Sequence, residues 1–423
     1  MSTTADAPEG TSPAGRWDRA TTALLAGFFA GSAGATALVT ALGKQVYDLS
    51  GRELDLGLLG LAEFAPAALL VLVTGTIADR VDRRRVASLG ALGEGAMALL
   101  IVAYVGGSPT AVGPLFACAL GFGVARAFVA PASRSLPADI VPSEVLPWLV
   151  ARWSITFQVA LITGPVLAGT LYAIDPAVPF VAAAGLFAAS SLAFALIPSP
   201  ARDQAVRTTA TAVPVGRGRL HEALEGLRFV RRQPILLGAI SLDLFAVLFG
   251  GAVALLPAIA EERLGVGAVG FGWLRAANGI GASVVMLVLA FRPVRRCVGP
   301  TLLTAVATFG GATILLGVTR NYAVAFLALL VLSGADALSV FIRITLVPLV
   351  TPASARGRVL AVENVFIGAS NELGAFESGV TGQMLGPAPA VALGGVATLV
   401  VAASWSRLFP ALRAVDRFPS GEP

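Results

Sequence analysis

Long apolar runs recur along nearly the whole chain, and they limit the possible folds more than any other feature. A helix that crosses a membrane needs about 20 consecutive, mostly apolar residues. The chain has 423 residues, of which 56% are hydrophobic and only 13% are charged. A soluble globular protein has about 25% charged residues, so we expect an all-α membrane protein with twelve transmembrane helices. The expected spans are roughly 20–45, 56–78, 86–106, 111–133, 149–173, 178–198, 235–260, 267–291, 299–318, 323–350, 359–384 and 388–410.

The arginines predict how these spans are oriented. They gather in loops on one side of the expected membrane, together with both ends of the chain, whereas the other side has only Arg52, Arg263 and Arg320. Loops rich in arginine face the cytoplasm. We therefore expect a multi-pass protein of a bacterial cytoplasmic (inner) membrane, with both termini in the cytoplasm.

The longest polar interruption, near the middle of the chain, predicts two groups of six helices. Its second part has Leu220, Leu224 and Leu227 at helical spacing, which is typical of an amphipathic helix at a membrane surface. The expected division is a disordered tail at 1–19, six-helix bundles at 20–198 and 235–411, a linker with an amphipathic helix at 199–234, and a cytoplasmic tail at 412–423.

The remaining composition excludes several other classes of protein. Cys118 lies in an apolar run and Cys297 in an arginine-rich loop, a pattern that predicts neither a disulfide framework nor a metal site. The net charge of +5 is spread over many loops, so it does not indicate nucleic-acid binding. We find no Walker motif, phosphate-binding glycine loop or nucleophile elbow, and we expect no cofactor and no enzyme activity.

The most charged stretch of the chain carries six charges in seven residues between two apolar runs. It resembles the signature loop between helices 2 and 3 of the major facilitator superfamily, with Asp82 in place of the second glycine. The resemblance implies a secondary transporter with two pseudo-symmetric bundles and a small-molecule substrate. The alternative is an ordinary cytoplasmic loop that collects arginine. The residues that match are Gly75, Asp79, Arg80, Arg83 and Arg84, and together with Glu363 they are the expected conformational gate.

Two further stretches resemble parts of this superfamily. Gly164, Pro165 and Gly169 are similar to the antiporter motif of its exporters, which implies export by exchange; a purely structural kink is the alternative. The segment from Arg126 to Arg134 resembles the enterobactin-exporter-like and multidrug efflux branch. That likeness implies proton-driven export of a siderophore, a drug or another amphiphile.

Ionisable residues inside the spans are the candidate site residues, since each costs roughly 2.5–3.5 kcal/mol at the bilayer centre. A buried carboxylate can bind and release a proton near neutral pH, whereas a fixed ion pair is the structural alternative. Glu94 is expected to pack rather than to line the cavity. The candidates for proton coupling are Asp243, Glu372, Glu63 and Asp336, and those for the substrate cavity are Arg126, Arg275, Arg343, Asn371 and Glu377.

These expectations combine into one functional hypothesis with two alternatives. The hypothesis is a monomeric, proton-coupled exporter of an amphiphilic small molecule, working by alternating access in the lipid bilayer. Uptake or lipid flipping by the same fold is the first alternative. A membrane scaffold or sensor that transports nothing is the second, and the buried acids argue against it.

Overall fold

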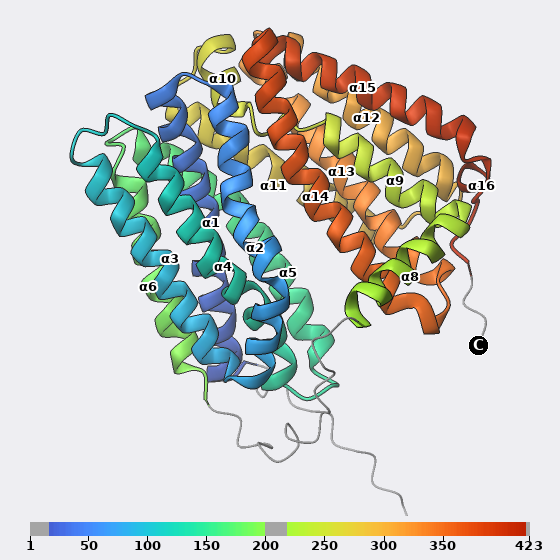
Figure 1. Ribbon diagram of the computed structural model, residues 1–423, viewed down its shortest axis with the longest axis horizontal. Helices are drawn as coiled ribbons and strands as arrows, with labels where there is room; N and C mark the ends of the chain where they lie inside the picture. The colour runs from blue at the N-terminus through green and yellow to red at the C-terminus, as the bar shows by residue number, and fades with distance from the viewer. Residues whose placement is uncertain (1–16, 199–217, 420–423) are drawn as a thin grey trace, which may run out of the picture.

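The computed structural model describes residues 17–198 and 218–419, with side chains placed except at 71–73, 75–80 and 218–224, and these parts are all-helical (Figure 1). The first group of helices is α1 (Arg19–Ser50), α2 (Glu53–Arg80), α3 (Arg83–Val105), α4 (Gly113–Ile140), α5 (Leu146–Tyr172) and α6 (Val178–Leu196). The second group is α8 (Gly218–Arg232), α9 (Pro234–Phe249), α10 (Leu256–Ala258), the π-helix η2 (Ile259–Arg263), α11 (Ala268–Phe291), α12 (Val298–Val318), α13 (Tyr322–Val350), α14 (Ala353–Leu385), α15 (Pro387–Leu408) and α16 (Pro410–Arg413).

The long helices of the described chain follow the expected spans one by one. Nine of them are long and apolar enough to cross a membrane, and α9 adds a tenth when it is joined to the end of α8, from which it bends by 106°. The other two, α2 and α14, have 28 and 33 residues and pack against each other. The chain is therefore an all-helical membrane protein, as its apolar runs predict.

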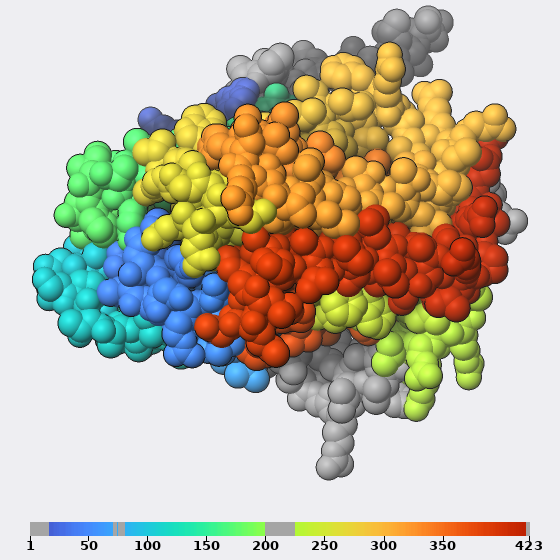
Figure 2. Space-filling model, turned by 90° about the horizontal axis from the view of Figure 1, so that it is seen from above, coloured from blue at the N-terminus to red at the C-terminus, as the bar shows by residue number. Residues whose placement is uncertain are grey.

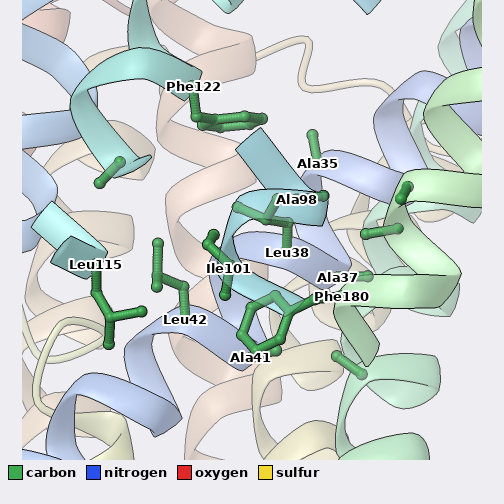
Figure 3. Close-up of a cluster of buried hydrophobic side chains, with 14 of the residues drawn as sticks. Ala35, Ala37, Leu38, Ala41, Leu42, Ala98, Ile101, Leu115, Phe122 and Phe180 are labelled. Carbon is green, nitrogen blue, oxygen red and sulfur yellow. The ribbon is translucent and has the colours of Figure 1, made fainter. Parts of the chain in front are cut away.

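Each group of helices packs mainly on itself. In the first group, α1 lies against α5 and α6, and α3 lies against α4 and α6. The centre of this group is an apolar cluster that includes Leu38, Ile101, Phe122 and Phe180, all with at most 1% of their surface exposed (Figure 3). In the second group, α12 packs on α13 and α15. Small residues such as Ala35 and Ala98 let these helices approach closely.

Several boundaries differ from those expected. The span expected at 235–260 ends as α9 at Phe249, and a turn then leads to α10 and η2. The disordered tail was expected to reach residue 19, but Trp17 packs edge-on against Trp148 at 5.1 Å and Asp18 caps α1 through Thr21. The amphipathic helix forms as α8, and its Gly226 lies against the backbone of Arg358 on α14. An ion pair between Glu225 and Arg358 adds to this contact, so α8 is docked on the second group. The first part of the linker lies outside the described residues.

The turn between α2 and α3 explains why aspartate replaces the expected glycine. Asp82 is the N-cap of α3, and its carboxylate accepts hydrogen bonds from the Arg84 amide at 3.0 Å and from the Arg84 guanidinium. These bonds satisfy an otherwise unpaired amide of the first helical turn. Arg84 also donates to the carbonyl of Ile197, which ties this turn to the end of α6.

The two groups of helices meet at one end of the molecule, which we call the Lys44 end. There α2 crosses α14 and α5 crosses α11 at glycines: a Cβ atom on Gly379 would lie 2.9 Å from Cα of Gly57, and one on Gly272 would lie 2.9 Å from Cα of Gly169. Viewed from this end, the segments coloured blue, yellow and red-orange lie directly against one another (Figure 2). The opposite end, which holds Arg83 to Arg85, is called the arginine-rich end.

Hydrogen bonds from η2 reinforce closure of the Lys44 end. Glu261 accepts a hydrogen bond from Lys44 of α1 at 2.9 Å, and Glu262 accepts one from the hydroxyl of Tyr47. The wider turn of a π-helix presents these two consecutive acids to the same neighbouring helix. Arg263 donates to the carbonyls of Val318 and Thr319 and so holds η2 against α12. Toward the arginine-rich end, the two groups diverge (Figure 1).

Replacing Asp82 by alanine should lower the free energy of unfolding by about 1 kcal/mol, and replacing it by glycine only by a few tenths, because glycine is itself a fair N-cap. The hydrogen bond from Arg84 holds the pKa of Asp82 below its usual range. The contribution of Asp82 to the free energy of unfolding is therefore complete above about pH 4, and it is lost as the pH falls through the lowered pKa of Asp82. Thermal unfolding of the three proteins in detergent at several pH values measures this, and an alanine variant as stable as the native chain would contradict it.

Replacing Gly57 by valine should hold the Lys44 end apart, because no side chain fits where α2 meets the backbone of α14. The measurement is the distance between spin labels placed at Ser50 and Leu385 by electron resonance, with both native cysteines replaced. Gly311 of α12 has open space around its Cα, so Gly311→Val is the matched control. We expect a longer mean distance for Gly57→Val alone; equal distances for both variants would show that the glycine contact does not set the closure.

Candidate functional site

A cavity with two lobes lies between the two groups of helices. The first lobe has a volume of about 560 Å³ and is lined by α1, α2, α4, α5, α11 and α14. The second has a volume of about 1210 Å³ and is lined mainly by α1, α3, α4, α5, α11 and α13. Both share Arg126, Ala130 and Arg134, which follow one another along a face of α4. Small side chains such as Ala35 and Ala67 leave the space that the first lobe occupies.

The first lobe brings together four of the predicted site residues, two from each group of helices. Glu63 of α2 and Arg126 of α4 face Arg275 of α11 and Glu372 of α14. The charges that act on Glu63 come from the other three residues. A Cβ atom on Gly60 would lie 3.1 Å from Oε2 of Glu372, so this carboxylate lies over α2, one turn from Glu63.

Glu63 is the least satisfied group of this lobe. Its Oε1 atom is buried and has no hydrogen-bond partner among the residues that the structure describes. Burial of an unpartnered carboxylate oxygen is unfavourable while the group is charged, and proton binding removes that charge.

Glu94 of α3 is buried, with 1% of its side chain exposed, as expected for a packing residue. It also borders the second lobe, where its Oε1 lies 3.8 Å from a terminal nitrogen of Arg126. A glutamate between two glycines, Gly93 and Gly95, was the sequence signal for it, because small neighbours let another helix approach. Asp336 of α13 lines the same lobe from the other side.

Aromatic and aliphatic side chains form the rest of the second lobe. Phe28 of α1 packs on Trp153 of α5 with ring centroids 4.0 Å apart, and Phe157 follows at 6.2 Å from Phe28. Leu287 of α11 completes this apolar wall. Gln158 of α5 and Ser283 of α11 also line this lobe. Gln158 donates to the hydroxyl of Ser283 at 3.2 Å, a hydrogen bond between the two groups of helices.

A buried charge cluster lies in the second group of helices, outside both lobes. Arg343 of α13 contacts Asp243 of α9 at 2.7 Å and Glu363 of α14 at 3.8 Å, and each side chain is at most 7% exposed. Arg343 was expected to line the cavity and Glu363 to serve the gate, but the structure places both in this cluster. Asp243 has the fixed partner that was the structural alternative for the buried acids. Asp336 is the member of this neighbourhood that reaches the second lobe.

The remaining predicted cavity residues lie elsewhere on α14. Asn371 is exposed and donates to the carbonyl of Ile367 one turn earlier. Glu377 accepts a hydrogen bond from Thr381 at 2.8 Å. Neither residue is among the described residues that line the two lobes. The sequence could not show which face of α14 turns to the cavity.

The residues of the expected antiporter-like kink lie within α5 where the two groups meet. Gly164 packs against Thr36 of α1, Pro165 lines the first lobe, and Gly169 is the contact point with Gly272 of α11. This part of α5 therefore runs from the cavity to the Lys44 end.

Of the expected gate residues, Arg83 and Arg84 make bonds within the first group. Arg83 donates to both carboxylate oxygens of Asp139 on α4, each at 3.0 Å. Gly75, Asp79 and Arg80 belong to the last turns of α2, and their side chains lie outside the described part of the structure. The described residues include no group of three His, Cys, Asp or Glu side chains that could hold a metal ion.

Comparison with known proteins identifies the family of the chain. Residues 23–375 match the sequence model of the Major Facilitator Superfamily. The chain belongs to this superfamily. It is 26% identical over 288 residues to YfiS of Bacillus subtilis (strain 168), an uncharacterised transporter of the same type, and the match covers 67% of this chain and 64% of that relative. The members of this superfamily are transporters and not enzymes.

Solved structures of other transporters have the same fold. A bacterial homologue of the human lysosomal transporter Spinster, in an inward-facing and occupied conformation, aligns with a TM-score of 0.71 at 15% identity and covers 96% of this chain and 98% of its own. The nucleoside transporter NupG aligns with a TM-score of 0.67 at 15% identity, covering 92% and 98%. At these identities, the likeness establishes the fold alone.

Replacing Arg343 by methionine should destabilise the protein by roughly 3–5 kcal/mol, because it leaves Asp243 and Glu363 buried without their cation. The double variant Arg343→Met with Asp243→Asn should be less unstable than the single one, since one of the uncompensated charges is gone. Thermal unfolding and the yield of folded protein in membranes report this difference. If the two variants were equally stable, the ion pair would not hold α9, α13 and α14 together.

Proposed function

We propose that this chain is a proton-coupled secondary transporter that carries an amphiphilic small molecule by alternating access. The observation that carries the proposal is the cavity between the two groups of helices, in which Glu63 and Glu372 from opposite groups share one lobe with Arg275 and Arg126. A membrane scaffold has no need of a cavity that exposes charged groups from both of its halves.

The proposed motion is a rocking of residues 20–198 against residues 235–411. The Lys44 end is held by backbone contacts at glycines and by hydrogen bonds to η2, whereas the second lobe extends past Trp153 toward the arginine-rich end. We infer that the arginine-rich end faces the cytoplasm of a bacterial cell, with both termini there. The state described here is then open to the inside, like the Spinster homologue. We propose that the transporter works as a monomer.

Glu63 and Glu372 are the proposed proton-binding groups, and Asp336 is the next candidate. Each lines the cavity, and no described residue gives any of them an ion pair within 4.0 Å. Asp243, by contrast, is bound to Arg343 and is more important for stability. A proton on Glu63 changes how strongly its group of helices is held to Arg275 of the other group, which links proton binding to the rocking motion.

Export is the proposed direction. It is supported by the stretch at Gly164, Pro165 and Gly169, which runs from the cavity to the Lys44 end and resembles the exporter motif. The apolar wall of the second lobe suits a siderophore, a drug or a related amphiphile. Uptake or lipid flipping would use the same helices and differ only in the direction in which a proton gradient drives flux.

Replacing Glu63 or Glu372 by glutamine should reduce flux driven by a pH gradient at least about 10-fold, since glutamine cannot exchange the proton. The measurement is the flux of a fluorescent amphiphile in proteoliposomes of known orientation, with Glu377→Gln as the matched control because Glu377 lies outside both lobes. The control should transport as the native protein does.

Flux that is unchanged in both variants would exclude these acids from the coupling. Flux into vesicles only when the gradient is reversed would replace export by uptake. If no amphiphile crossed the membrane faster than in empty vesicles, the result would support the alternative of a scaffold that transports nothing.

A further inference from the structure

The charged groups of the second lobe indicate which amphiphiles enter it. We propose that this lobe binds amphiphiles with an anionic group, a carboxylate, sulfonate or phosphate, which Arg126 and Arg134 of α4 hold. This inference rests on the proposed function, because it names the class of substrate that the cavity accepts.

Arg126 is a cation with unused hydrogen-bonding capacity inside a membrane protein. Its side chain is 46% exposed although it lies near the middle of α4, and that exposure is to the two lobes. It donates no hydrogen bond to any residue that the structure describes, and its guanidinium lies 5.8 Å from the ring centroid of Phe122. A guanidinium has five N–H donors in a planar fork, which matches an anion with two oxygens.

Arg134 continues the positive charge along the same wall. It follows Arg126 by eight residues, so the two lie on one face of α4 about 12 Å apart along the axis. Ala130 lies between them, and its small side chain leaves the face open. Arg134 is exposed and lines both lobes. An anion that enters from the arginine-rich end meets Arg134 before it reaches Arg126.

Glu94 is the internal counter-ion that such an anion has to replace. It is nearly fully buried, its Oε1 has no hydrogen-bond partner among the described residues, and 3.8 Å from Arg126 is too far for a hydrogen bond. The pair is therefore attracted but not bonded, and both partners keep unsatisfied polar atoms. An anionic ligand offers Arg126 the hydrogen bonds that Glu94 does not make, and the charge of Glu94 competes with it.

The other walls decide how the ligand lies. Phe157 and Ile155 of α5 expose 40% and 62% of their surface, and Leu287 of α11 exposes 61%, which suits an apolar body. Asp336 of α13 is the other acid that lines this lobe, and it repels an anion from that side. The anionic group is therefore directed to α4 and the apolar body toward α5 and α11. Glu63, Glu372 and Arg275 line the first lobe, and Arg126 is shared by both lobes, so an anion held by Arg126 lies next to the proposed proton-binding groups.

Two probes that share one apolar ring test the proposal: dansylglycine, with a carboxylate, and the dansyl amide of ethylenediamine, with an ammonium. Binding to the full chain in lipid nanodiscs is followed by energy transfer from tryptophan. We expect tighter binding of dansylglycine, a loss of roughly 10-fold or more in Arg126→Gln, and a gain of several-fold in Glu94→Gln, because the competing charge is gone. Arg152→Gln is the matched control, since Arg152 packs on Trp148 outside both lobes and should leave the affinity unchanged.

Several results would overturn the proposal: equal or tighter binding of the ammonium probe, unchanged binding in Arg126→Gln, or weaker binding in Glu94→Gln. If Arg126→Gln fails to fold, the change in dansylglycine affinity in Glu94→Gln still tests the proposal: tighter binding supports it and weaker binding contradicts it. Flux of both probes in proteoliposomes separates this inference from the proposed function. Selective binding of the anionic probe without gradient-driven flux would support the proposed ligand class and contradict the transport function. Transport of the ammonium probe alone would support the transport function and contradict the proposed ligand class.

Discussion

The cost of placing charge in hydrocarbon determines most of what is distinctive in this molecule. An ionised side chain at the centre of a bilayer is unfavourable by several kcal/mol unless it meets water or an opposite charge. The structure meets this requirement in two ways. Arg343 lies between the carboxylates of Asp243 and Glu363 in a buried cluster that joins three helices. Glu63, Glu372, Glu94 and Asp336 instead line the cavity, where we propose that protons or a ligand reach them.

The contact between the two groups of helices depends on the smallest residues. Glycines on α2, α5, α11 and α14 let the backbones touch at the Lys44 end, and no side chains interdigitate at those points. When such a contact opens, few side chains have to change their packing, which is consistent with the proposed rocking of the two groups of helices. The hydrogen bonds of Lys44 and Tyr47 to η2 fix the relative orientation of the two groups of helices, because they form only when α1 and η2 are aligned.

The sequence was sufficient to predict the helices, since runs of apolar residues in a membrane protein admit one kind of structure. It was less informative about the site. The sequence showed which ionisable residues lie inside the spans, but it could not show that Arg343 turns toward Asp243, or that Asn371 and Glu377 turn away from the lobes. Those facts depend on contacts between helices that are far apart in the chain.

Glu94 is a second residue whose surroundings the sequence could not show. It lies on a helix that usually supports the cavity in this superfamily, so a general rule assigned it to packing. Gly93 beside it lets α3 approach α4 at Ala125, whereas Gly95 faces α6, and the close approach of α3 to α4 brings the carboxylate to Arg126. Asp82 shows that local chemistry can also be missed: the departure from the family glycine provides a helix cap, which a motif comparison does not reveal.

The central claim is that the cavity is open to one side of the membrane and closed to the other, and that transport exchanges the two. Phe157 lines the second lobe and is replaceable by cysteine in a chain without Cys118 and Cys297. The decisive measurement is the rate at which a membrane-impermeant maleimide labels Phe157→Cys from each side of oriented vesicles. Fast labelling from the arginine-rich side alone, with labelling from the Lys44 side appearing only during turnover, is the predicted result. Equal labelling from both sides at rest, or from neither during turnover, would contradict it.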